Sequence, residues 1–143
     1  MYDSILVATD GSETASDATV HAVDLARQYD ATLNAVAVLE SRTDYDNAIV
    51  DPEEVERRRR AEAETTLETV EASARDASIS VETAIRSGVP HAEILAVADD
   101  CDADVIVVGA RGRSEFRRKL LGSTADRVVR LADRPVLVVG TDD

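Results

Sequence analysis

The sequence contains no long apolar run and only one cysteine among its 143 residues. A membrane-spanning helix needs about 18 or more consecutive apolar residues, and the first residues, Met1 to Ser4, lack the basic flank of a signal peptide. We therefore expect a protein of the cytoplasm that does not enter the membrane. Cys101 has no second cysteine with which to form an intrachain disulfide, and we interpret it as a half-buried structural thiol.

Positive charge is also scarce. Lys119 is the only lysine, and the 29 Asp and Glu residues outnumber the 16 basic residues, which gives a net charge of −13. A surface this acidic repels nucleic acid and anionic membranes, so we expect neither as a partner. The composition resembles that of proteins from salt-loving microbes, in which dissolved salt screens the repulsion between carboxylates. We interpret the acidity as an adaptation to habitat and not as a binding site.

The four consecutive arginines Arg57–Arg60 could suggest an RNA-binding patch. Glutamates stand four residues before three of these arginines, the spacing at which opposite charges pair along a helix. We therefore predict a solvated, salt-bridged helix face here.

Short apolar runs alternate with segments of helical periodicity along the chain. The expected strands are Ser4–Ala8, Leu33–Leu39, Ile79–Ile85, Val105–Val108 and Val136–Val139. The expected helices are Ala15–Asp30, Pro52–Ala77, Pro90–Ala98 and Ser123–Ala132, the first two capped by Ser12 and Asp51. This alternation predicts one α/β domain over residues 1–143, with a mostly parallel sheet between two helical layers. Such folds bind ligands at the carboxyl ends of their strands.

Two glycine-containing segments stand where such a ligand would lie. Gly109 and Gly112 follow the fourth strand, together with Arg111 and Arg113, and Gly122 precedes Ser123 and Thr124 at the start of a helix. Glycine lets backbone N–H groups approach phosphate oxygens, and a helix amino end carries partial positive charge. The pattern favours a phosphate site, although glycines that only form turns and arginines that only solubilise the loop remain an alternative.

Signals of catalysis are missing from the sequence. His21 and His91 show no metal-binding or nucleophile pattern with Cys101, so we assign them surface or packing roles. The Gly-x4-Gly-Lys-Ser/Thr motif, whose lysine reaches the β- and γ-phosphates, is also absent. We expect neither catalytic residues nor a metal held by the protein, and no efficient hydrolysis.

The pattern Gly109-x2-Gly112-x9-Gly122-Ser123 follows one apolar strand and precedes another, Arg134–Val139. Together with the opening segment Ile5–Ser12, it resembles the nucleotide signature of the universal stress protein family, and the resemblance covers the entire chain. It implies a Rossmann-like fold of the adenine nucleotide alpha hydrolase type. The implied parallel sheet has five strands in the order 3-2-1-4-5.

The resemblance also implies ATP, ADP or AMP across the carboxyl ends of the strands, with Mg²⁺ held by the phosphates. Residues implied to border adenine and ribose are Ala8, Thr9, Asp10 and Val38. Residues implied to wrap the ribose and phosphates are Gly109, Ala110, Arg111, Gly112, Arg113 and Ser114, with Gly122, Ser123 and Thr124 closing around the phosphate tail. A homodimer through Val136–Val139 is implied too, and pairing would cover an exposed sheet edge there.

Our leading hypothesis is an ATP-binding homodimer with a stress or regulatory role, read by a protein partner that the sequence does not identify. One alternative is a slow ATPase or phosphotransferase in which Ser123 accepts phosphate. Another is a dimeric interaction module that needs no nucleotide.

Overall fold

The computed structural model describes residues 1–40, 51–111 and 121–140, which contain five strands and four helices. The strands are β1 (Ser4–Ala8), β2 (Thr32–Glu40), β3 (Val81–Gly88), β4 (Val105–Gly109) and β5 (Val136–Val139). The helices are α1 (Glu13–Tyr29), α2 (Pro52–Asp76), α3 (Pro90–Asp100) and α4 (Ser123–Leu131). All neighbouring strands are parallel, in the order β3-β2-β1-β4-β5. The predicted sheet order is therefore confirmed.

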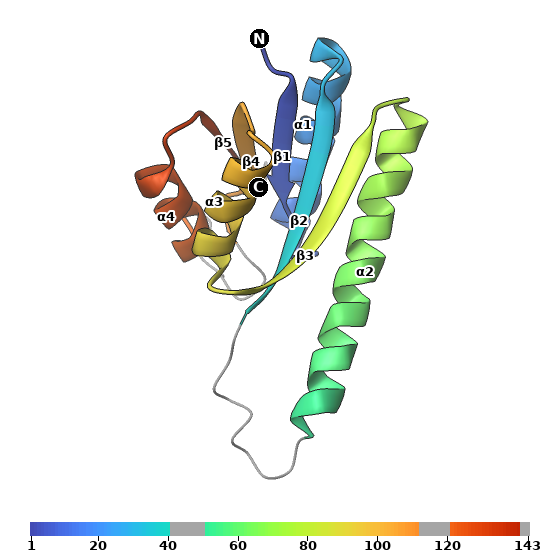
Figure 1. The fold of residues 1–143 in the computed structure, drawn as a ribbon, viewed down its shortest axis with the longest axis vertical. Helices are drawn as coiled ribbons and strands as arrows, with labels where there is room; N and C mark the ends of the chain where they lie inside the picture. The colour runs from blue at the N-terminus through green and yellow to red at the C-terminus, as the bar shows by residue number, and fades with distance from the viewer. Residues whose placement is uncertain (41–50, 112–120, 141–143) are drawn as a thin grey trace.

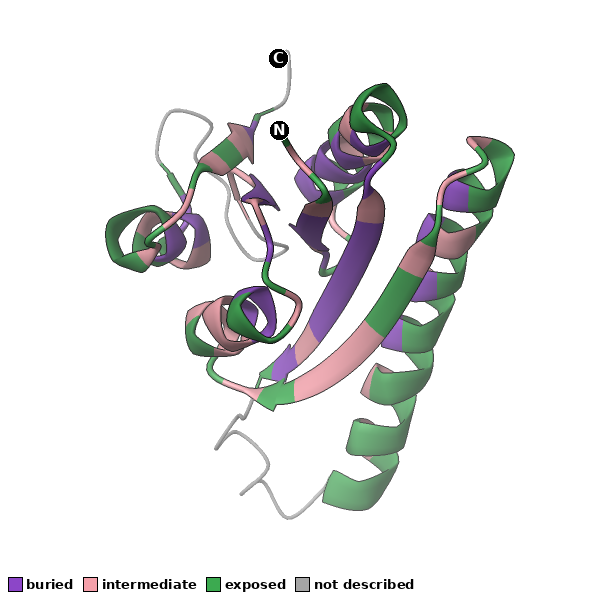
Figure 2. Ribbon diagram, turned by 45° about the horizontal axis from the view of Figure 1, so that its top comes forward, coloured by how far each residue is buried: buried purple, intermediate pink, exposed green. Residues whose placement is uncertain are grey.

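The sheet lies between two helical layers, with α1 and α2 on one face and α3 and α4 on the other (Figure 1). Because successive residues of a strand point to opposite faces, Ile5 and Val7 of β1 pack toward α1 and α2, whereas Leu6 packs toward α3 and α4. The central strands are the most buried, and the edge strand β3 is largely intermediate or exposed (Figure 2). The central strands thus form the core of both faces.

Local capping explains where α1 and α2 begin. Ser12 Oγ accepts a hydrogen bond from the Ala15 amide at 3.2 Å, and Asp51 Oδ1 accepts one from the Glu53 amide at 3.1 Å. Pro52 occupies the first turn of α2, where the backbone N–H that proline lacks would make no hydrogen bond within the helix. Both predicted caps are confirmed.

The third strand begins two residues later than predicted. Ser78 adopts a left-handed conformation with φ of 59°, and the Ile79 amide donates to the Ala74 carbonyl at 3.0 Å. This contact closes the carboxyl end of α2, as in a Schellman motif. Ile79 therefore belongs to the capping turn that follows α2, and β3 pairs with β2 from Val81 onward.

The two halves of α2 differ in their packing. Its buried residues, Ala63, Leu67, Val70 and Ala74, lie from the middle of the helix onward, and the early turns are mainly exposed (Figure 2). The amino-terminal half of α2 therefore extends beyond the packed core at the carboxyl side of the sheet (Figure 1).

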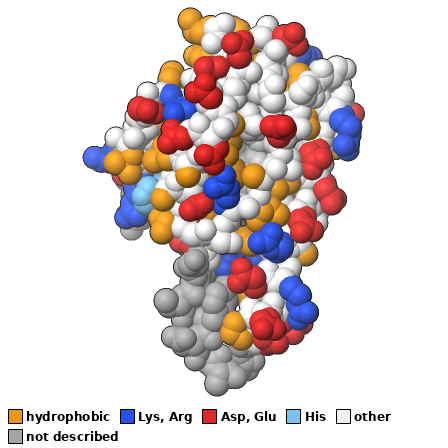
Figure 3. Space-filling model, in the orientation of Figure 1, with side chains coloured by type: hydrophobic (Ala, Val, Ile, Leu, Met, Phe, Trp, Pro, Cys, Tyr) orange, Lys and Arg blue, Asp and Glu red, His pale blue; other side chains and the backbone are white. Residues whose placement is uncertain are grey.

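Charged side chains are dispersed on the face seen in Figure 3, where acidic and basic groups alternate without forming a single-sign patch. Within residues 1–40, 51–111 and 121–140, no helix combines the length and the apolar character needed to span a bilayer.

Candidate functional site

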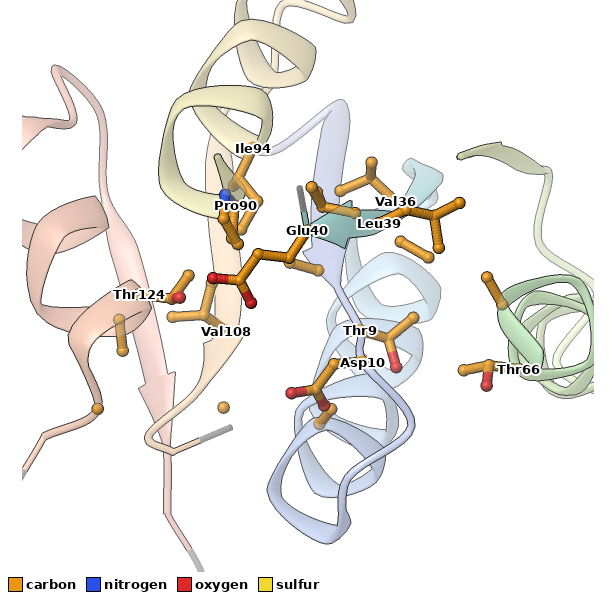
Figure 4. A pocket seen from close by; sticks show the side chains of 18 of the residues that line it. Thr9, Asp10, Val36, Leu39, Glu40, Thr66, Pro90, Ile94, Val108 and Thr124 are labelled. Atoms are coloured by element: carbon orange, nitrogen blue, oxygen red, sulfur yellow. The ribbon is translucent and has the colours of Figure 1, made fainter. Parts of the chain in front are cut away.

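A cavity of about 330 Å³ opens at the carboxyl ends of the strands. This volume is at the lower end of the range typical of small-molecule sites, about 300 to 1,000 Å³. Its described walls come from the ends of β1, β2 and β4, from the first turns of α3 and α4, and from one side of α2. Figure 4 shows Pro90, Ile94, Val108 and Thr124 on one side of the cavity, Thr66 on the other, and Thr9 and Asp10 between them.

The turn between β1 and α1 is held by its own polar groups. The Thr9 amide donates to the Val36 carbonyl at 2.9 Å, and the Asp10 carboxylate accepts from the Ser12 amide at 2.9 Å. Gly11 has φ of 80°, a conformation that few other residues adopt, and its amide donates to Thr9 Oγ1 at 3.3 Å. These contacts fix Thr9 and Asp10 at the cavity wall.

Gly109 allows α1 to approach β4 closely. It lies on the same face of β4 as Val105 and Val107, beneath the first turn of α1. A Cβ at this position would lie 2.8 Å from both the carbonyl carbon and Oγ1 of Thr14. The Thr14 hydroxyl also donates a hydrogen bond to the Arg111 carbonyl. The glycine is therefore needed for packing against α1, a role that the sequence pattern did not indicate.

A backbone contact brings the two glycine-containing segments together. The Gly122 amide donates to the Ala110 carbonyl at 2.7 Å, and the Ala110 amide donates to the Val139 carbonyl of β5 at 2.8 Å. Gly122 is the N-cap of α4 and has no side chain with which to cap the helix. The amino end of α4, with Ser123 and Thr124, therefore faces the cavity as a potential anion site.

Most of the predicted site residues that the structure describes share this cavity. Those in its lining are Ala8, Thr9, Asp10, Val38, Gly109, Arg111, Gly122, Ser123 and Thr124. Ala110 is not in the lining, and its peptide groups bind Val139 of β5 and Gly122. Gly112, Arg113 and Ser114 lie outside the described residues.

Sequence reasoning missed the contribution of α2. Arg59, Glu62 and Thr66 line the cavity, and Arg59 Nη1 donates to the Glu40 carbonyl at 2.9 Å. The expectation of a fully solvated arginine face is therefore wrong for Arg59, although Arg58 pairs with Glu54 at 4.0 Å as expected. Helical spacing could have indicated this position, because Arg59 stands four residues before the buried Ala63 and therefore lies on the same helical face.

Among the residues that the structure describes, the two side chains with a shifted pKa lie at the opposite, amino edge of the sheet. Burial raises the pKa of the Cys101 thiol, which favours the unreactive protonated form. Backbone amides of Asp3 and then Ser4 donate to the Asp104 carboxylate and lower its pKa. Within the described ranges no group of three or more His, Cys, Asp or Glu residues is arranged to hold a metal ion.

Known proteins are similar to this chain in both sequence and fold. Universal stress protein MJ0531 of Methanocaldococcus jannaschii is 33% identical over 144 residues, which cover 97% of this chain and 82% of the relative. A solved structure of MJ0577 from the same organism matches with a TM-score of 0.87 at 29% identity, covering 100% of this chain and 99% of the other.

Two similar structures contain nucleotides. A universal stress protein in complex with cAMP matches with a TM-score of 0.76 at 25% identity, covering 99% of each chain. One from Archaeoglobus fulgidus in complex with dAMP matches with a TM-score of 0.70 at 26% identity, covering 96% of this chain and 98% of the other. The model of the universal stress protein family matches residues 1–140. This chain therefore belongs to the universal stress protein family.

Proposed function

We propose that the protein binds an adenine nucleotide, ATP foremost, in the cavity at the carboxyl ends of the strands. The contact between the Gly122 amide and the Ala110 carbonyl is the main support, because it sets the amino end of α4 beside the segment that follows β4. Similar structures with cAMP and dAMP support an adenine nucleotide as the ligand class.

The cavity has walls suited to both halves of such a ligand. Apolar side chains of Ala8, Val38, Pro90 and Ile94 lie in the lining near the ends of β1 and β2 and the start of α3. The amino end of α4 and Arg111 provide positive potential where the lining continues past the end of β4. We assign the nucleoside to the first region and the phosphates to the second, with Mg²⁺ held by the phosphates.

Thermal unfolding with and without ATP and Mg²⁺, in molar KCl because of the acidic surface, tests this function. We expect a stabilisation of about 2.7 kcal/mol when ATP is present at a hundred times Kd. A folded protein that millimolar ATP leaves unchanged would contradict the proposal. Mass spectrometry of any small molecule released by denaturation would identify the nucleotide.

Ser123 offers a variant that separates binding from folding. An aspartate in the first turn of a helix favours the helix, but at this position its charge would repel a phosphate tail. S123D should therefore keep its stability without ligand and lose the stabilisation by ATP, whereas the matched control S123A should lose little of it. Equal stabilisation of S123D and the natural protein by ATP would show that the phosphates do not bind at the amino end of α4.

We further propose a homodimer that pairs through β5. Within the described part of the chain β5 pairs only with β4, and Leu137 on it is 38% exposed. A second copy would satisfy the open backbone edge and cover apolar side chains. Sedimentation at micromolar concentration in high salt should give a dimer, and a monomer under these conditions would refute the pairing. The dimer would serve a regulatory role in response to stress.

A further inference from the structure

One side of α2 faces the cavity. Arg59, Glu62 and Thr66 belong to its lining and succeed one another at spacings of three and four residues, which places them on one helical face. We call these three residues the α2 stripe. Thr66 also meets the β1–α1 turn, because its hydroxyl lies 3.3 Å from the point that a Cβ on Gly11 would occupy. The stripe therefore adjoins the turn that carries Asp10.

Arg59 differs from its neighbour in the same arginine run. Its guanidinium donates to the Glu40 carbonyl at the end of β2, at 2.9 Å, and lines the cavity. The Arg58 side chain is 69% exposed and pairs with Glu54, one turn earlier on its own helix, at 4.0 Å. The structure thus places one arginine of the run at the cavity and another on the outer surface.

The strand order determines which half of a nucleotide the α2 stripe would meet. Arg59 is bound at the end of β2, whereas Arg111 and the amino end of α4 follow β4, and β1 lies between these two strands. Neighbouring strands are about 4.8 Å apart, so β2 and β4 are separated by about 10 Å. A nucleotide with its phosphates at α4 therefore has its nucleoside directed toward β2 and α2.

A purine at this end of the cavity would be stabilised by stacking on a planar group. The described lining contains no aromatic side chain. A guanidinium is planar and stacks on aromatic rings, and its hydrogen bond to Glu40 restricts its orientation. The Glu62 carboxylate, one turn along the stripe, can accept hydrogen bonds from amino or hydroxyl groups of a nucleoside.

We propose that Arg59 is a nucleoside-binding residue, whose guanidinium, held by the Glu40 carbonyl, stacks on the base of the bound nucleotide. This inference rests on the proposed function and adds α2 to the nucleotide site. Arg59 contributes to affinity through the base and not through the phosphates.

Calorimetric titration of the natural protein, R59A and R58A with AMP and with ATP and Mg²⁺ tests the inference. R59A should weaken the binding of both nucleotides by a similar factor, about 3- to 30-fold. R58A removes the same charge from the outer surface and should leave both affinities unchanged. R59K keeps the charge but loses the planar group, so it should bind both nucleotides more weakly than the natural protein does.

The outcomes separate this inference from the proposed function. Unchanged affinities in R59A would overturn the inference while leaving nucleotide binding intact. A loss that appears with ATP but not with AMP would also overturn it, because Arg59 would then contact phosphates. Thermal unfolding without ligand checks that R59A remains folded, and R59K provides the decisive comparison where it does not. Failure of the natural protein to bind either nucleotide would refute the proposed function itself.

Discussion

The two ends of the sheet differ in how their backbone polar groups are hydrogen-bonded. At the amino end, side chains bind backbone groups: Asp104 Oδ2 accepts from the Asp3 and Ser4 amides at 2.7 and 3.0 Å, and Arg134 Nη1 donates to the Ala98 and Ala103 carbonyls at 2.8 Å each. At the carboxyl end, the Gly122 amide binds the Ala110 carbonyl directly, and polar side chains line a cavity. One end is closed by its side chains, and the other directs several of them toward a potential ligand.

This difference separates stability from binding along the chain. Side-chain changes at the amino end of the sheet should lower stability without altering nucleotide affinity, because the cavity lies at the opposite end of the strands. At the carboxyl end, backbone packing maintains the cavity, whereas Ser123 and Arg59 line it and are the side chains that we propose contact the nucleotide. The variants below test this separation.

The largest effect is expected for Gly109→Ala. The added Cβ would lie 2.8 Å from the backbone of Thr14, so α1 or β4 must shift, at a cost of about 3 kcal/mol. Chemical denaturation measures this loss. The matched control is Gly140→Ala, where a Cβ would meet no atom within 4 Å and stability should change little. Equal stability of the two variants would show that α1 does not need this close approach.

A smaller loss is expected for Arg134→Met at the amino end. The Arg134 side chain is 15% exposed, and its removal leaves the Ala103 carbonyl without its charged donor. Hydrogen bonds to charged groups contribute about 1.5 to 3 kcal/mol, so we expect a loss of about 2 kcal/mol in denaturant titrations. ATP affinity, measured on the same protein, should stay within error. A clear drop in affinity would break the separation between the two ends.

The smallest effect is expected for Asp104→Asn, and it depends on pH. The folded-state pKa of Asp104 is lowered, first by the Asp3 amide, so the charged carboxylate stabilises the fold above its unfolded-state pKa. This contribution is lost as the pH falls through the folded-state pKa, below about pH 4. The variant should be less stable than the natural protein at neutral pH, with the difference shrinking in acid. A difference in stability that does not depend on pH would show that the charge of Asp104 does not cause it.

The sequence predicted the fold more fully than the site. Apolar runs and the Ser12 and Asp51 caps located the elements, because local chemistry determines them. The family resemblance supplied the strand order, which periodicity cannot give. The start of β3 was misplaced because the left-handed Ser78 places Ile79 in the turn that caps α2, and no glycine marked that turn.

The sequence predicted the lining residues that belong to a motif. It missed those that only tertiary packing brings to the cavity. Ser123 and Thr124 follow the Gly122 motif and line the cavity. Arg59 stands in a charged run that reads as solvated surface, and only the lateral position of α2 brings it to the end of β2. Ala110 stands at a variable position between the motif's glycines and is not in the cavity lining, and its peptide groups bind the backbone of Val139 and Gly122.

Ala110 thereby joins two boundaries of the molecule. Its amide meets the last residue of the outermost strand and its carbonyl meets the residue that opens α4, so a single amino acid spans both. In the proposed dimer, a subunit paired along β5 and an anion bound at α4 would both contact elements that are hydrogen-bonded to Ala110. If both proposals hold, we expect dimer formation and anion binding to be coupled through these two backbone hydrogen bonds.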